Sequence, residues 1–279
     1  MTRRTHAERL AARDGYFSPD SMVRLLGNSP VTPFLGGGAA VLLQVAHPLV
    51  ACGVTEHSGF DRNLWRRLNG TLRALYLIAF GDKREAEQAG AAVQAVHRRV
   101  QGSTTERLGP FPPGTGYAAS DPELMLWVHA TLVESSLAAF ERFVRPLTAD
   151  ERERYVGEMN LVARLFGMPA DVLPPTYQDF RVYFEGRLAG GDITVTAPAR
   201  KVASVILAAQ LPLPLRLLAP AHRLATAYIL PPRLRREYGL RWTPLRERAL
   251  PLAGGAVRYD TAPVLTLAAH LPTPRILAA

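Results

Sequence analysis

Apolar residues recur at helical spacing between Asp61 and Gly102. In the first half of this stretch they return every three or four residues, which places them on one face of a helix. These positions are Leu64, Leu68, Leu72, Leu75 and Ala79. The second half repeats the spacing at Ala89, Ala92, Val93, Val96 and Val100. A turn at residues 81–83 is too short for any other connection, so the pattern predicts an antiparallel helical hairpin.

The remaining pattern is also helical. Residues 33–54 are apolar nearly all round, as expected for a central buried helix. Further helices are expected at 21–26, 121–144, 148–166, 176–188 and 231–239, and two more within the apolar stretch 201–232. The longest β-like alternation is Ile193 to Ala197, and Gly and Pro make residues 102–123 a long surface loop. The sequence therefore predicts an all-α fold with a single helical domain.

Length and composition allow one large core. The chain has 279 residues, of which 48% are hydrophobic. We expect residues 1–18 to form an arm, residues 19–240 the domain, and residues 241–279 a tail packed on it. The single cysteine, Cys52, excludes an internal disulfide and a cysteine-rich metal site. No apolar stretch follows Arg3 and Arg4, so a cytoplasmic location is expected.

The net charge of +9 is concentrated late in the chain. Residues 1–199 hold 21 basic and 21 acidic side chains, whereas residues 200–248 hold ten basic and two acidic ones. Such an excess fits nucleic acid or an anionic membrane. Because no aromatic series accompanies the arginines, we expect no nucleic-acid partner and predict peripheral membrane contact through residues 200–248.

Three polar residues on the predicted hairpin need a role other than packing. Arg67 and Thr71 are four residues apart on one helical face, and His97 interrupts an apolar run. Counted from Gly81, Arg67 and His97 lie at the same level, within roughly 3 Å along the axis. Directly packed helices are about 8–10 Å apart. A planar cofactor here would need splayed helices or would approach from the edge of the pair.

The order of the motifs HPLVACGVTEHS, RLNGT, AVHRRV, SDPELMLWVHATLVES and ERFVRPLTADERERY resembles the MpaB-type oxygenases, relatives of the haem-containing latex-clearing proteins. The resemblance covers roughly Pro19 to Gly239. It implies a globin-like helical core that binds haem b (iron), with His97 as the proximal metal ligand. The family's Arg-x-x-x-Thr falls on Arg67 and Thr71, which would bind the cofactor and act in catalysis.

The resemblance also implies a function. We expect a haem-dependent oxygenase that uses dioxygen on an apolar, alkene-containing small molecule; the alternative is a non-catalytic haem or lipid carrier with the same pocket. Latex-clearing proteins have a lysine directly before the threonine, where this chain has Gly70. A closed state gated by that lysine is therefore not expected here. The sequence leaves open the substrate and the choice between mono- and dioxygenation.

Three more histidines belong to the recognised pattern. His57, with Glu56, is predicted to reach the pocket as a distal acid or base. His47 and His129 are predicted to contribute to the cofactor pocket, although His47 precedes Pro48 and could instead repair a helix kink. Other chemistries lack their motifs: the sequence contains no Glu-x-x-His pair, no His-Glu-x-x-His and no Gly-x-Ser-x-Gly.

Overall fold

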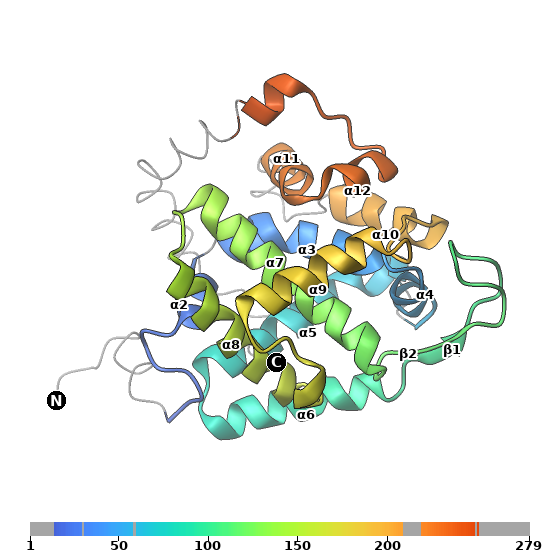
Figure 1. Cartoon of the computed structure of the whole chain (residues 1–279). Coiled ribbons are helices and arrows are strands. Elements are labelled where there is room, and N and C mark those ends of the chain that lie inside the picture. The colour runs from blue at the N-terminus through green and yellow to red at the C-terminus, as the bar shows by residue number, and fades with distance from the viewer. Residues whose placement is uncertain (1–13, 30, 58–59, 209–218, 249, 251–279) are drawn as a thin grey trace.

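The computed structural model describes residues 14–29, 31–57, 60–208, 219–248 and 250, and of residues 60–69 it describes the backbone alone. The described chain is mostly helical (Figure 1), which confirms the predicted all-α class. The helices are α2 (Met22–Asn28), the π-helix η1 (Thr32–Gly36), α3 (Gly37–Val45), α4 (Pro48–His57), α5 (Phe60–Phe80), α6 (Lys83–His97), α7 (Pro122–Phe143), α8 (Ala149–Leu165), the 3-10 helix η2 (Ala170–Val172), α9 (Tyr177–Ala189), α10 (Ala197–Leu207), α11 (Ala219–Ile229) and α12 (Pro232–Glu237).

The core is built around α3 and α7. Helix α3 packs against α7, α10 and α11, and α7 also packs against α8 and α9 (Figure 1). The Trp127 ring on α7 stacks on Phe184 of α9, with 5.6 Å between ring centroids. Its indole N–H donates to the carbonyl oxygen of Leu43 at 3.2 Å, so the largest buried side chain is apolar on its faces and satisfied at its one polar atom.

The apolar run at residues 33–54 is not one helix, as the sequence suggested. It forms η1 and α3, and then turns by 104° before α4 starts at Pro48. Proline lacks the backbone N–H that would continue α3, and it fits the first position of a new helix. Within the described residues, no single helix is long and apolar enough to cross a membrane, although this bent pair would pass by length and composition.

The predicted hairpin is confirmed as α5 and α6, which pack against each other. Asp82 caps α6: its side chain accepts from the Glu85 N–H at 2.8 Å, and the Glu85 carboxylate accepts from the Asp82 N–H at 3.0 Å. This reciprocal pair is a capping box. Only two residues, 81 and 82, separate the end of α5 from the start of α6, and so short a connection makes the two helices run antiparallel.

The end of α6 differs from the prediction. The helix stops at His97 and does not continue to Val100. The chain then enters a two-stranded antiparallel sheet of β1 (Gln101–Ser103) and β2 (Gly116–Ala118), in which Gly102 faces Tyr117. These strands lie in the stretch predicted to be loop, whereas residues 193–196, with the strongest β-like alternation, are not in a strand.

Local capping signals predicted most other helix starts. Thr148 and Glu151 form a second capping box at α8, and Asp121 caps α7 through the Glu123 N–H at 2.8 Å. Ser21 caps α2, which begins one residue later than expected. Of the predicted arm and tail, residues 1–13, 249 and 251–279 lie outside the described residues. Near the start of the tail, Trp242 stacks on Tyr228 of α11 with 6.0 Å between ring centroids.

Candidate functional site

The predicted site residues of the hairpin lie at its open end. Residue 67 is in the N-terminal half of α5 and residue 71 is near its middle, and His97 is the last residue of α6. Because the two helices run antiparallel from the turn at residues 81–82, these segments are at the same end of the pair. The Thr71 side chain is exposed, and His97 is half-buried with its Nδ1 atom shielded from solvent. The side chain of Arg67 lies outside the described residues.

Large apolar side chains on this hairpin face solvent. Leu72 and Tyr76 on α5 are 47% and 41% exposed, and Val96, next to His97, is 56% exposed. A Cβ built at Gly70 would meet no atom within 4 Å. Leu72 was predicted to face the core, but among the α5 side chains that the structure describes the buried ones are Ala74, Ile78, Ala79 and Phe80. Exposed apolar side chains at the open end of the hairpin, Leu72 and Val96, are candidates for a binding surface.

The residue types present at this end of the hairpin are those that a haem site uses. A haem needs an imidazole ligand for its iron and apolar walls for its ring. His97 offers the imidazole, Leu72 on α5 and Val96 on α6 offer exposed apolar surface, and Gly70 adds room. Since α5 and α6 pack directly on each other, the cofactor would be held beside the open end of the pair and not between the helix axes.

A polar cluster joins the end of α4 to β2. The Tyr117 hydroxyl donates a short hydrogen bond to Glu56 Oε2 and lies 3.2 Å from His57 Nε2. Cys52 Sγ donates to Glu56 Oε1 at 3.1 Å. The hydrogen bond from Tyr117 is the main cause that lowers the pKa of Glu56. Burial is the main cause that raises the pKa of Tyr117, and the contact with Glu56 adds to it. The same two causes raise the pKa of the Cys52 thiol to about 12. Negative charge is therefore held on Glu56 at neutral pH.

The cluster is tied to the end of α6. Val100 follows His97 by three residues, and its N–H donates to the His97 carbonyl oxygen at 3.1 Å. A Cβ at Gly53 would lie 3.5 Å from Val100 Cγ1, so α4 passes directly beside this turn. The sequence predicted His57 and Glu56 but missed Tyr117 and Cys52. The available signal for Tyr117 was its place in a long ordered loop, which is often functional.

His47 and His129 are neutral, buried imidazoles. His47 is 2% exposed, and its Nδ1 accepts from the Leu49 N–H at 3.3 Å, so it caps the start of α4. Burial, and then the charge of Arg187, lowers the pKa of His47 to about 4. Burial likewise lowers the pKa of His129 to about 4, partly offset by a hydrogen bond with Asn160. Both contacts are structural, and a role for these two rings in the cofactor pocket stays a prediction.

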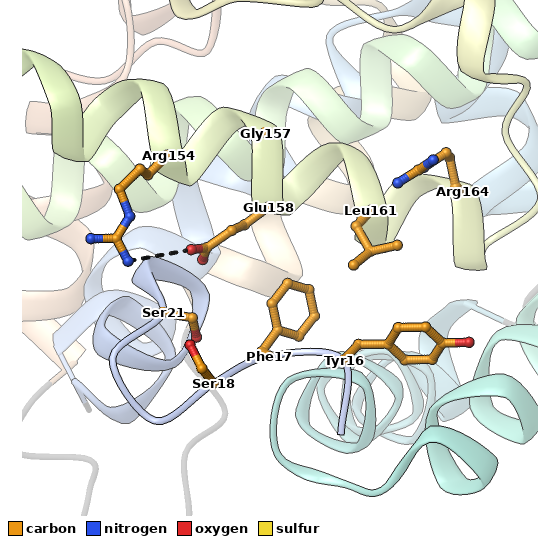
Figure 2. Close-up of a pocket in the computed structure, with 9 residues that line it drawn as sticks. All are labelled: Tyr16, Phe17, Ser18, Ser21, Arg154, Gly157, Glu158, Leu161 and Arg164. Carbon is orange, nitrogen blue, oxygen red and sulfur yellow. Dashed lines mark ion pairs between the residues drawn. The ribbon is translucent and has the colours of Figure 1, made fainter. Parts of the chain in front are cut away.

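A cavity of about 350 Å³ lies elsewhere, between residues 16–21 and α8 (Figure 2). Phe17 and Leu161 give it an apolar middle, and Arg154 reaches toward Glu158 at 3.9 Å. The Glu158 carboxylate also accepts from the Val23 N–H at 2.8 Å and thereby supports the start of α2. The residues that line this cavity include none of the predicted site residues.

The basic segment at residues 200–248 uses several arginines internally. Arg235 is 5% exposed, pairs with Glu247 at 3.0 Å and lies over the Trp242 ring at 4.1 Å. Arg233 donates to the carbonyl oxygens of Leu188 and Ile193, both at 2.8 Å. Some of the basic side chains in this segment therefore hold α12 in place by contacts within the protein. Membrane contact through residues 200–248 stays a prediction.

Comparison with known proteins places this arrangement in a family. Residues 24–259 match the model of the family described as ER-bound oxygenase mpaB/B'/Rubber oxygenase, catalytic domain. Two uncharacterized proteins, one from Mycobacterium tuberculosis and one from Mycobacterium bovis, are each 28% identical to the chain over 218 residues, which cover 75% of this chain and 81% of the relative. No solved structure matches the chain. Since the family model spans most of the sequence, the chain belongs to the MpaB and rubber oxygenase family of oxygenase catalytic domains.

Proposed function

We propose that this protein is a haem b-dependent oxygenase that acts with dioxygen on an apolar, alkene-containing small molecule, and that His97 is the ligand of the haem iron. The observation that carries the proposal is the position of His97 as the last residue of α6, at the open end of the α5–α6 hairpin and next in sequence to the exposed side chain of Val96. Membership of an oxygenase family supplies the reaction class.

The protein's own contribution begins with binding. Leu72 and Val96 are the side chains that would cover the apolar ring of the cofactor and exclude water from it. Burying these two exposed groups would favour binding by roughly 25 cal/mol for each Å² removed from water. The haem, when bound, supplies the chemistry of dioxygen activation. An apolar substrate would be held by the same surface, since it offers few polar atoms that would discriminate against a hydrocarbon.

Polar residues around this surface would handle charge and protons. The Thr71 hydroxyl is exposed and can donate a hydrogen bond. Arg67 lies one turn earlier on α5, and a guanidinium suits a carboxylate of the cofactor or negative charge that develops during the reaction. His57, held by Tyr117, would act as an acid or base.

The first prediction concerns haem binding. Purified protein supplied with hemin should show a Soret absorption band, and His97→Ala should lose it because the iron loses its imidazole ligand. His222→Ala, which removes a histidine from α11 that the proposal does not use, should keep the band. Added imidazole should restore the band in His97→Gly, which would show that the variant is folded. A His97→Ala protein with an unchanged Soret band would refute the ligand assignment.

Turnover separates the enzyme from a carrier. The loaded protein should be incubated with a panel of alkenes under oxygen-18 gas, and the products analysed by mass spectrometry. Products that contain oxygen-18, formed by wild type but not by His97→Ala, are expected for an oxygenase. A normal Soret band without any oxygenated product across the panel would favour the haem or lipid carrier.

A further inference from the structure

The cluster at the end of α4 forms a chain of hydrogen bonds with a defined direction. Tyr117 is at its centre, with its hydroxyl bonded to Glu56 Oε2 and 3.2 Å from His57 Nε2. The rings of Tyr117 and His57 meet edge to face at an interplanar angle of 78°. Tyr117 is 6% exposed, so most of its side chain is shielded from water.

Counting protons fixes the direction of the chain. A tyrosine hydroxyl has one proton to donate and lone pairs with which to accept. Glu56 accepts from both Tyr117 and Cys52, and a carboxylate that receives two hydrogen bonds is ionised at neutral pH. The single Tyr117 proton therefore goes to Glu56. The contact between His57 Nε2 and the Tyr117 oxygen must then be donated by His57, from an Nε2–H group.

We propose that Tyr117 is a positioning residue that sets the tautomer of His57. By accepting from Nε2–H it leaves Nδ1 as the unprotonated nitrogen of the neutral ring. In a histidine the hydrogen bond at one ring nitrogen decides which nitrogen can accept a proton. The relevance of Nδ1 to catalysis rests on the proposed function, because only there does His57 act as a base; the tautomer itself does not require a bound haem.

The backbone holds Tyr117 in this position. Gly102 faces Tyr117 across the β1–β2 pair, and a Cβ at Gly102 would lie 2.6 Å from the Tyr117 hydroxyl oxygen. A side chain at position 102 would therefore crowd the hydroxyl that reaches Glu56. The titratable groups that face the cluster are Glu56 and His57 from α4 and, through its effect on Cys52, Glu106 from the loop.

The test uses the full chain without added haem. Two-bond ¹H–¹⁵N spectra of the imidazoles distinguish the two neutral tautomers, and His57→Gln identifies the His57 signals. In wild type at pH above 7.5 we expect His57 to be the Nε2–H form. Tyr117→Phe removes the acceptor oxygen and should convert the signals to a mixture of tautomers. Gly102→Ala keeps the tyrosine but crowds its hydroxyl, and should have the same effect.

Tyr16→Phe is the matched control. It also removes a tyrosine hydroxyl that donates to a glutamate, Glu87 Oε1 at 2.7 Å, but it should leave the His57 signals unchanged. An Nδ1–H form of His57 in wild type would overturn the proposal. So would a Tyr117→Phe protein in which the tautomer is unaltered.

The loaded protein gives a second measurement. If wild type oxygenates an alkene, Tyr117→Phe should lower kcat more than it raises KM and should shift the pH dependence of kcat. A protein that binds no haem would refute the proposed function while the tautomer result stands. A protein that binds haem, yet shows the wrong tautomer, would refute this inference alone.

Discussion

Among single residues, Cys52 shows how the polar cluster controls reactivity. The thiol is 4% exposed and donates to Glu56. Burial first, and then the hydrogen bond and charge of Glu56, raise its pKa to about 12. Only a thiolate reacts with disulfide reagents. At pH 8 the thiolate fraction would be on the order of one in 10⁴, against roughly a quarter for an ordinary cysteine.

The second prediction follows from that fraction. A chromogenic disulfide reagent at pH 8 should modify the native protein far more slowly than the protein unfolded in urea. Because the chain has a single cysteine, the colour change reports on Cys52 alone. Glu56→Gln should speed the native reaction, while Glu87→Gln should not. Equal rates for native and unfolded protein would show that the thiol is not held neutral.

The candidate site could be predicted only in part at this scale. His57 and Glu56 follow each other in the chain and end an apolar run, which drew attention to them. Tyr117 is 61 residues from Glu56, and its loop carries no periodic pattern that would place it beside α4. Its role can be seen only in the folded structure, where the β1–β2 pair places Tyr117 beside Glu56 at the end of α4.

Among elements, two helical glycines predict opposite effects on stability. Gly90 of α6 crosses α8, and a Cβ there would overlap the Leu165 carbonyl oxygen. Gly157 of α8 is exposed, and a Cβ there would meet no atom within 4 Å. Glycine inside a helix costs roughly 1 kcal/mol relative to alanine. The close approach of α6 and α8 is the reason that a glycine is needed at position 90 despite this cost.

The third prediction compares Gly90→Ala with Gly157→Ala. Gly90→Ala should destabilise the protein by about 1–3 kcal/mol, as overpacking does, whereas Gly157→Ala should stabilise it by roughly 0.5–1 kcal/mol. Urea unfolding, followed by circular dichroism, measures both. A Gly90→Ala protein as stable as Gly157→Ala would show that α6 and α8 are not in close contact.

For the whole molecule, buried histidines link stability to pH. His47 and His129 have pKa values of about 4 in the folded state, below the ordinary value of about 6.5. Between those values the unfolded chain binds protons that the folded chain does not. The free energy of unfolding should therefore fall as the pH drops through that interval. The limit is on the order of 3 kcal/mol for each imidazole.

The fourth prediction is measured as the urea midpoint between pH 7 and pH 5. The midpoint should decrease with falling pH, and His129→Gln, which cannot take up the proton, should show a shallower decrease. The window stops at pH 5 because burial raises the pKa of Glu158. Protonation of this carboxylate at lower pH would raise the free energy of unfolding and oppose the effect of the histidines. A midpoint that stays constant or rises would mean that these imidazoles take up protons in the folded protein at least as readily as in the unfolded chain.

Local chemistry in the sequence determined where most helices start and that the fold is helical. Asp82 with Glu85, and Thr148 with Glu151, are three residues apart, so their capping bonds form within one turn and need no distant partner. The same holds for the short turn that makes α5 and α6 a hairpin.

Tertiary structure decided which way the hairpin's side chains face and what stands beside them. Leu72 and Val96 match the helical period of core residues, yet they are exposed, because burial depends on whether another element covers that face. Helix α6 ends at His97 because the chain pairs Gly102 with Tyr117. Contacts between residues so far apart depend on the path of the loops that connect the helices. The periodicity of apolar residues predicts local helices and gives no information about that path.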